Sequence, residues 1–283
     1  MKIFVYAGTG LVSGLVIEGL LAKGHEVYAG SRNPEAAKKA PNLHWIKTDV
    51  SQPSLGLDVL EKTERAFLLC PPGIADQYGV LNPWIEAAKG KGLKKIVLMT
   101  AIGVDQSPED LPFRKLEIAL EKSGVPYNIV RPNWFMQNFQ TFWISGILKD
   151  KKIYFPAGKA KTSFIDARDI AASSVSLLLD DSKNGEGFTL TGKDSITHDE
   201  VAEKISKATG LSIQFADITP EEFKKGLLGA GVPEDYANVL VFLAGMLKEG
   251  YVAAVSDNVK SITGKEPISF DQYAQDNKKV WLN

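Results

Sequence analysis

Residues 3–14 read Ile3-Phe4-Val5-Tyr6-Ala7-Gly8-Thr9-Gly10-Leu11-Val12-Ser13-Gly14. The stretch begins as an apolar run typical of a buried strand, turns at its small residues, and continues as a helix with Val12, Leu15, Val16 and Leu20 on one face. The glycines follow the spacing GxGxxxG rather than GxGxxG, so an ordinary glycine-rich turn is the alternative interpretation. The position of the turn between the first strand and the first helix favours a dinucleotide site.

The chemistry of this turn suits a diphosphate. Small residues let the backbone approach the ligand closely, and the free amides at the start of the helix supply hydrogen-bond donors. The cofactor-binding residues predicted here are Gly8, Thr9, Gly10, Leu11 and Val12.

The first 132 residues alternate between short aliphatic runs and helix-length segments. Strand-like runs lie at residues 3–6, 26–30, 43–47, 66–70, 96–99 and 127–130, and helical segments at 11–23, 34–40, 55–62, 76–89 and 111–122. Short apolar strands separated by helices predict a parallel sheet that is covered on both faces. The expected fold class is therefore α/β, with a doubly wound parallel sheet of the Rossmann type.

The alternation weakens after residue 132. We expect a dinucleotide-binding domain made of residues 1–132 and about 163–190, and a smaller α+β lobe made of about 133–162 and 191–283. Helices are predicted at residues 134–148, 167–179 and 199–208, and strands at 163–165, 188–190 and 212–216. The first two of these strands are expected to return to the sheet.

Composition excludes several classes of protein. The 283 residues carry 33 Lys+Arg against 34 Asp+Glu, so no nucleic-acid partner is expected. The longest apolar run, residues 239–247, is too short to cross a bilayer, and no signal peptide is visible, so no membrane partner is expected. The single cysteine, Cys70, agrees with a reducing cytoplasm, and three scattered histidines predict no metal site.

The end of the second predicted strand selects the cofactor. An NAD-binding protein usually carries an acidic residue there for the ribose hydroxyls. This chain has Ser31 and Arg32 instead, and its next carboxylate is Glu35. The Arg32 guanidinium suits a 2′-phosphate and the Ser31 hydroxyl can add a bond, which favours NADP(H) over NAD(H). The alternative is a surface arginine beside a turn.

Four segments resemble the NmrA-like group of the atypical short-chain dehydrogenase/reductase family. They are residues 7–13 (AGTGLVS), 130–139 (VRPNWFMQNF), 164–171 (FIDARDIA) and 190–192 (LTG). The group includes NADPH-dependent quinone and triphenylmethane-dye reductases and the reductases of ergot-alkaloid pathways. Ala7 and Ser13 stand where the first and third glycines of the group would be, so a slightly wider turn is expected.

The resemblance implies further roles. Asp49 would face the adenine edge, and Asn133 and Trp134 would lie near the nicotinamide. The residues that would line the cofactor after the fourth and fifth strands are Cys70, Pro71, Thr100 and Ala101.

The catalytic pair of the well-known dehydrogenases of this superfamily is missing. In those enzymes a Tyr-x-x-x-Lys pair protonates the nascent alkoxide. Here Phe113 stands at the lysine position and Glu109 at the tyrosine position. We therefore expect a reductase whose acceptor needs little acid catalysis, such as a quinone or a delocalised cation. Its substrate pocket is predicted to contain Phe113, Asn133, Trp134, Phe135 and Gln137.

Two alternatives remain open. The aromatic cluster that includes Phe139, Phe142 and Trp143 lines the substrate pocket in one interpretation and packs in the core in the other. The missing pair also suits a protein that binds the dinucleotide as a redox sensor and acts through a protein partner. Such a sensor is expected to expose an apolar patch large enough for that partner.

Overall fold

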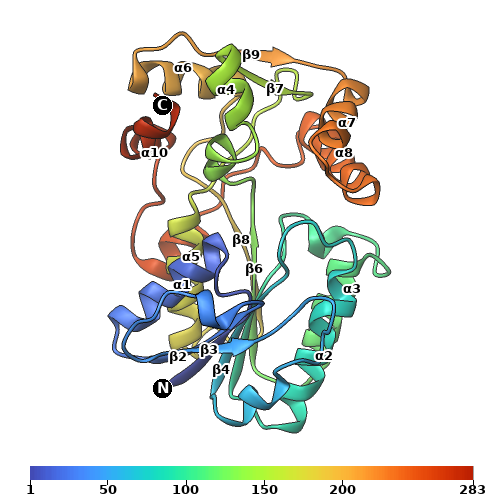
Figure 1. Cartoon of the computed structure of the whole chain (residues 1–283), viewed down its shortest axis with the longest axis vertical. Helices are drawn as coiled ribbons and strands as arrows, with labels where there is room; N and C mark the ends of the chain where they lie inside the picture. The colour runs from blue at the N-terminus through green and yellow to red at the C-terminus, as the bar shows by residue number, and fades with distance from the viewer. Residues whose placement is uncertain (283) are drawn as a thin grey trace. The chain divides into compact units, whose positions relative to one another are not determined.

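The computed structural model describes residues 1–282, and its main feature is a seven-stranded sheet (Figure 1). The strand order is β3-β2-β1-β4-β5-β6-β8, and every pairing among β1 to β6 is parallel. The strands are β1 (Lys2–Val5), β2 (Glu26–Ser31), β3 (Leu43–Lys47), β4 (Arg65–Leu69), β5 (Lys95–Met99), β6 (Tyr127–Pro132) and β8 (Glu186–Leu190). The chain runs outward from β1 to β3 and then returns to β4 beside β1, which is the point where doubly wound sheets bind ligands.

Helices cover both faces of this sheet, which confirms the predicted α/β fold (Figure 1). The helices are α1 (Leu11–Ala22), α2 (Gln77–Gly90), α3 (Pro112–Glu121) and α5 (Ala167–Leu179), with the 3-10 turns η1 (Pro34–Ala36), η2 (Leu57–Glu61) and η3 (Val104–Gln106). α2 packs against α3, and α1 packs against α5. The α1–α5 contact is so close that a Cβ on Gly19 would lie 3.1 Å from Val175.

The chain divides into two compact units. The first contains residues 1–132 and 167–189, and the second contains residues 133–166 and 190–283. In the second unit β7 (Lys152–Phe155) pairs in parallel with β9 (Gln214–Asp217). Its helices are η4 (Met136–Gln140), α4 (Ile144–Asp150), α6 (His198–Thr209), α7 (Pro220–Gly229), α8 (Glu234–Lys248), α9 (Asn258–Thr263), α10 (Phe270–Asn277) and η5 (Lys278–Trp281). None of the helices found in residues 1–282 is long and apolar enough to cross a membrane.

The continuous helix predicted for residues 134–148 is wrong. The chain instead forms the 3-10 turn η4, a break, and then α4. The indole N–H of Trp281 donates to the Phe139 carbonyl at 2.8 Å, where a regular helix would place the amide of Trp143. The Trp143 amide donates to Asn138 instead, and both Phe139 and Trp143 are buried.

The strand predicted for residues 163–165 is also wrong. This segment belongs to the second unit, where Ile165 forms an isolated parallel bridge with Phe135. The Ser163 hydroxyl donates to the Ala254 carbonyl at 2.7 Å, so local side-chain bonding replaces a strand ladder. The helices predicted at residues 34–40 and 55–62 are shortened to the 3-10 turns η1 and η2.

Candidate functional site

The turn after β1 is built from its own backbone. Ala7 adopts a left-handed conformation with a φ of 51°, which reverses the chain directly after the strand. The Gly8 amide donates to the Gly30 carbonyl at 2.7 Å, and the Gly10 amide donates to the Ala7 carbonyl at 2.9 Å. A Cβ on Gly8 would lie 2.9 Å from the Cβ of Ala29, so only glycine fits the contact with β2.

The start of α1 is open. Gly10 is its N-cap and supplies no side-chain hydrogen bond, and the first turn holds no acidic residue. The first amides of a helix lack intrahelical partners and lie at the positive end of its dipole. Thr9, Gly10 and Leu11 are exposed, so an anion can reach these amides. The geometry fits the diphosphate of a dinucleotide.

The Ser13 hydroxyl does not occupy the amides at the start of α1. The Ser13 side chain is fully buried, and its hydroxyl donates to the Tyr6 carbonyl at 2.8 Å. The hydroxyl therefore satisfies the end of β1 and leaves the helix start free.

The ends of β2 and β3 form a cationic edge. Ser31 pairs with Lys47 in the β2–β3 register, and the Lys47 ammonium donates to the carbonyl of the exposed Arg32. The Ser31 hydroxyl accepts from the Asn33 amide at 3.1 Å. Asp49 is held by the backbone and hydroxyl of Ser51, and these bonds, helped by the charge of Arg32, lower the pKa of its carboxyl. Sequence reasoning missed Lys47, because its proximity to Arg32 depends on strand register.

The predicted residues after β4 and β5 lie at the same edge, because the two strands are parallel neighbours. Cys70 and Pro71 follow β4 and are half-buried, while Thr100 and Ala101 follow β5. Burial raises the pKa of the Cys70 thiol to about 12, so the sulfur stays protonated and does not act as a nucleophile at neutral pH. The twelve predicted cofactor residues therefore all belong to the first unit.

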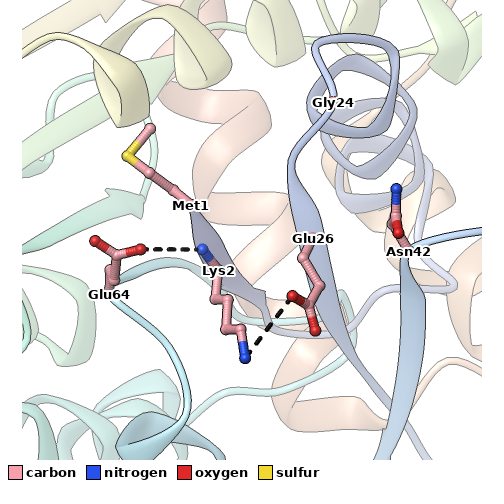
Figure 2. Close-up of a pocket in the computed structure, with 6 residues that line it drawn as sticks. All are labelled: Met1, Lys2, Gly24, Glu26, Asn42 and Glu64. Carbon is pink, nitrogen blue, oxygen red and sulfur yellow. Dashed lines mark hydrogen bonds and ion pairs between the residues drawn. The ribbon is translucent and has the colours of Figure 1, made fainter.

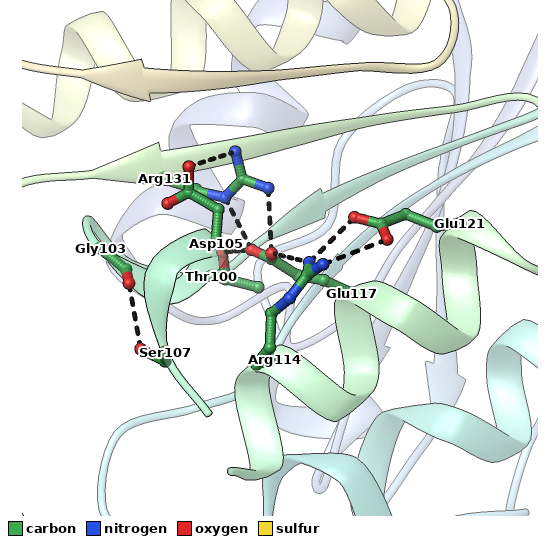
Figure 3. A network of polar contacts seen from close by, with 8 residues as sticks. All are labelled: Thr100, Gly103, Asp105, Ser107, Arg114, Glu117, Glu121 and Arg131. Atoms are coloured by element: carbon green, nitrogen blue, oxygen red, sulfur yellow. Dashed lines mark hydrogen bonds and ion pairs between the residues drawn. The ribbon is translucent and has the colours of Figure 1, made fainter. Parts of the chain in front are cut away.

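The Thr100 hydroxyl is bonded to a buried ionic network (Figure 3). Glu117 of α3 is fully buried, and its carboxylate accepts from the Thr100 hydroxyl at 2.6 Å. Arg131, at the end of β6, donates to both Glu117 oxygens at 2.9 Å, and Arg114 adds a bond at 3.0 Å. Arg114 also pairs with Glu121, and this contact is the main cause of its raised pKa.

One feature of the sequence points to this network. Arg131 lies at the end of an apolar parallel strand, where a charged residue must find a partner. A Cβ on Gly187 of β8 would lie 2.5 Å from the Arg131 guanidinium, so the glycine makes room for that side chain. The identity of the partner, Glu117, is set by the packing of α3.

The predicted substrate residues are divided between the two units. Phe113 belongs to the first unit and packs against its core, whereas the other four belong to the second. The Asn133 amide donates to Ser163 and to the Val252 carbonyl, both at 2.8 Å. Trp134 stacks on Trp143 with ring centroids 6.1 Å apart. Phe135 forms a backbone bridge with Ile165, and the Gln137 side-chain amide donates to the Asp166 carboxylate at 3.0 Å.

The aromatic cluster is partly core. Phe139 is fully buried and Trp143 is 5% exposed, so these two rings pack inside the second unit. Phe142 is 38% exposed and lines a shallow apolar hollow of about 250 Å³ with Tyr154 and Phe223.

The family model for the NmrA-like family matches residues 1–273. The chain belongs to the NmrA-like family. Prestalk A differentiation protein A from Dictyostelium discoideum is 30% identical over 281 residues, covering 98% of this chain and 92% of that protein. An NAD(P)H azoreductase from Xenophilus azovorans is 29% identical over 279 residues, covering 96% of each.

Solved structures share the fold of this NmrA-like protein. An NADPH-dependent quinone oxidoreductase from Escherichia coli, in complex with NADPH, aligns with a TM-score of 0.86 at 21% identity over 97% of this chain and 99% of that chain. The negative transcriptional regulator NmrA, in complex with NADP, aligns with a TM-score of 0.80 at 15% identity over 100% of this chain and 99% of that chain. The fold is therefore found in a reductase and in a regulator.

The NmrA-like chain has no tyrosine–lysine pair at the positions expected for one. Phe113 occupies the first turn of α3, and Glu109 lies in the exposed segment before that helix. The nearby Lys115 is held elsewhere, because its ammonium lies 4.1 Å from the centre of the Tyr78 ring.

A hollow of about 390 Å³ lies at the amino ends of the strands, and it is lined by Met1, Lys2, Gly24, Glu26, Asn42 and Glu64 (Figure 2). Its charges satisfy one another. The Lys2 amide donates to Glu64 at 3.3 Å, and the Lys2 ammonium lies 3.8 Å from Glu26. This hollow lies at the amino ends of the strands, away from the glycine turn.

Proposed function

We propose that this NmrA-like protein is an NADPH-dependent reductase that transfers hydride to a small conjugated acceptor, such as a quinone or a delocalised cation. The observation that carries the proposal is the open, amide-lined start of α1 beside the cationic edge formed by Arg32 and Lys47. An azoreductase relative using NAD(P)H supports the same class of chemistry.

The preference for NADPH rests on charge at the ends of β2 and β3. A 2′-phosphate is a dianion that a guanidinium binds through paired hydrogen bonds. Arg32 is exposed, and the Lys47 ammonium donates to its carbonyl from the neighbouring strand. An NAD ribose usually finds its carboxylate at the end of the second strand, whereas here Asp49 follows β3 and accepts two bonds from Ser51 on one of its oxygens.

In this proposal the protein orients the cofactor and the acceptor, and it does not act as an acid catalyst. NADPH, when bound, supplies the hydride. The strand ends and the glycine turn orient the dinucleotide, and Phe113, Asn133, Trp134, Phe135 and Gln137 are the residues predicted to contact the acceptor. An acceptor that spreads its new charge over a conjugated system needs no proton donor, which agrees with Phe113 and Glu109 at the positions of the missing pair.

Arg32→Glu tests the cofactor. The substitution puts a carboxylate where the phosphate would bind, so we expect NADPH affinity to fall about 100-fold, while NADH affinity changes by less than about threefold. Calorimetric titration of both dinucleotides measures the two values. Lys39→Glu makes the same charge change at an exposed site on the same loop, and it should leave both affinities near those of the original protein. Equal losses for NADPH and NADH in Arg32→Glu would show that Arg32 does not discriminate between them.

One observation favours a second candidate, a dinucleotide sensor that acts through a protein partner. α8 buries only Ala237, Ala244 and Leu247, and it leaves Val239, Phe242 and Leu243 exposed, with Phe242 at 60%. Turnover separates the candidates. A reductase oxidises NADPH when menadione or a triphenylmethane dye is added, whereas a sensor binds NADPH and leaves both unchanged.

A further inference from the structure

Glu117 has no unused hydrogen-bonding capacity. One of its oxygens accepts from the Thr100 hydroxyl at 2.6 Å and from Arg131 Nε at 2.9 Å. The other accepts from Arg131 at 2.9 Å and from Arg114 at 3.0 Å. The carboxylate is fully buried, and donors from α3, from β6 and from the residue after β5 converge on it (Figure 3). It is therefore fixed in place before any ligand binds.

This network decides what Thr100 can offer. A hydroxyl carries one hydrogen and two lone pairs, and an ionised carboxylate can only accept. The Thr100 hydrogen is therefore directed to Glu117, and rotation of the hydroxyl would break a short charge-assisted bond. The lone pairs of the Thr100 oxygen can still accept a hydrogen bond.

We infer that Glu117 is a positioning residue that makes Thr100 a hydrogen-bond acceptor, and not a donor, for the bound dinucleotide. The inference rests on the proposed function. Thr100 lies at the carboxyl end of β5, on the edge of the sheet that also carries the glycine turn. The cofactor supplies the donor, from an amide or a hydroxyl group, and Thr100 receives it without losing its bond to Glu117.

The inference also limits the substrates. A threonine that directs its hydrogen inward does not polarise a carbonyl oxygen, so position 100 gives no help to an ordinary ketone. Arg131 and Arg114 hold Glu117 in place, since each of its oxygens is bonded to a guanidinium. The chain is thereby suited to acceptors that take hydride without a proton from the protein.

Two substitutions of Thr100 test whether its oxygen contacts the cofactor, which the acceptor role requires. Thr100→Val keeps the shape and removes the oxygen, so the NADPH dissociation constant should rise about tenfold. Thr100→Ser keeps the oxygen and should stay within about twofold of the original protein. Thr63→Val is the matched control, because Thr63 is also buried in the first unit and its hydroxyl donates to the Val59 carbonyl before β4 begins. Equal NADPH affinity in Thr100→Val and Thr63→Val overturns the inference.

A double-mutant cycle tests the positioning role of Glu117. Glu117→Gln should weaken NADPH binding in the original background, and it should add no further loss in the Thr100→Val background, although it lowers the melting temperature in both. An equal loss of NADPH affinity in the two backgrounds shows that Glu117 acts through general structure, which overturns its assigned role. If Glu117→Gln does not fold, the comparison of Thr100→Val with Thr100→Ser still decides whether the Thr100 oxygen contacts the cofactor.

Failure of the inference is distinct from failure of the proposed function. If the original protein binds no NADPH in the same titration, the reductase proposal falls, and the inference that rests on it falls with it. If the original protein binds NADPH and Thr100→Val binds it equally well, only the inference is lost.

Discussion

At the scale of single residues, Ala7 shows how the dinucleotide turn is held. Its φ of 51° lies in the left-handed region, where an L-residue other than glycine is strained by about 1 kcal/mol or more. The bonds from Gly8 to Gly30 and from Gly10 to Ala7 keep the backbone in this conformation. The turn therefore depends on a small side chain at position 7 and does not require glycine there.

Ala7→Val should lower the free energy of unfolding by about 2 kcal/mol, because a β-branched side chain is disfavoured at positive φ. Ala7→Gly should change it by less than about 1 kcal/mol, since relief of strain is offset by a more flexible unfolded chain. Urea denaturation followed by circular dichroism measures both. Ala37→Val is the matched control, because Ala37 has a φ of -79° in extended backbone. A control as destabilised as Ala7→Val would show that the φ of Ala7 is unimportant.

At the scale of elements, α6 begins with a buried histidine. His198 is fully buried, and neither of its ring nitrogens has a hydrogen-bond partner. The aromatic rings within about 6 Å of it belong to Phe139, Trp143, Phe155, Phe164 and Phe215. Burial lowers its pKa to about 3, against the smaller opposing effects of Asp199 and Asp217. The imidazole acts as a neutral aromatic ring in this core.

This histidine predicts acid sensitivity. Its folded pKa lies below its unfolded value of 6.5, so the unfolded chain binds the proton first, and stability is lost as pH falls from 6.5 toward 3. The loss is about 1.4 kcal/mol per pH unit in that range. His198→Phe keeps an aromatic ring and removes the titration, so between pH 7.5 and pH 5 it should lose about 2 kcal/mol less unfolding free energy than the original protein. Denaturant titrations at the two pH values measure the difference, and identical losses would contradict the assignment.

The same elements show what sequence patterns can predict. α5 is predicted at residues 167–179 and occupies Ala167–Leu179. The prediction succeeds because the apolar periodicity that indicates a helix lies within the segment itself. The break between η4 and α4 depends on the bond from Trp281 to Phe139, two residues far apart in the chain. β7 was not predicted because a short strand takes its partner, β9, from a distant segment. In the site, the glycine turn and Arg32 were predicted from local pattern, whereas Lys47 and Glu117 depend on register and packing.

At the scale of the whole molecule, the first unit is assembled from two separate stretches of chain. Arg65 of β4 joins them, because its guanidinium donates to both oxygens of Asp181 at 2.9 and 2.7 Å and to the Leu178 carbonyl at 2.7 Å. Lys95 of β5 adds a bond to the Asp180 carbonyl, and burial lowers its pKa to about 8. The end of α5 is thus fixed to the strands by two cations, which also favour its negative dipole end.

Arg65→Met should lower the free energy of unfolding by about 2 kcal/mol. The variant keeps an apolar stem but leaves the Leu178 carbonyl without its donor, while the half-exposed Asp181 returns to water at little cost. Thermal unfolding measured by calorimetry tests this expectation. Lys94→Met is the control, because Lys94 forms an exposed ion pair with Glu64, and such pairs contribute about 0–1 kcal/mol. Equal melting temperatures for the two variants would argue against a joining role for Arg65.

The close packing of Gly19 on Val175 has a practical consequence for protein engineering. A truncated gene that ends at codon 132 would encode α1 without α5 and leave the sheet without β8, exposing apolar surface to aggregation. Chimaeras between family members therefore cannot be made with a single crossover. A recombinant that exchanges the smaller unit must graft residues 133–166 as an insertion and residues 190–283 as a tail, with the α1–α5 pair inherited from one parent.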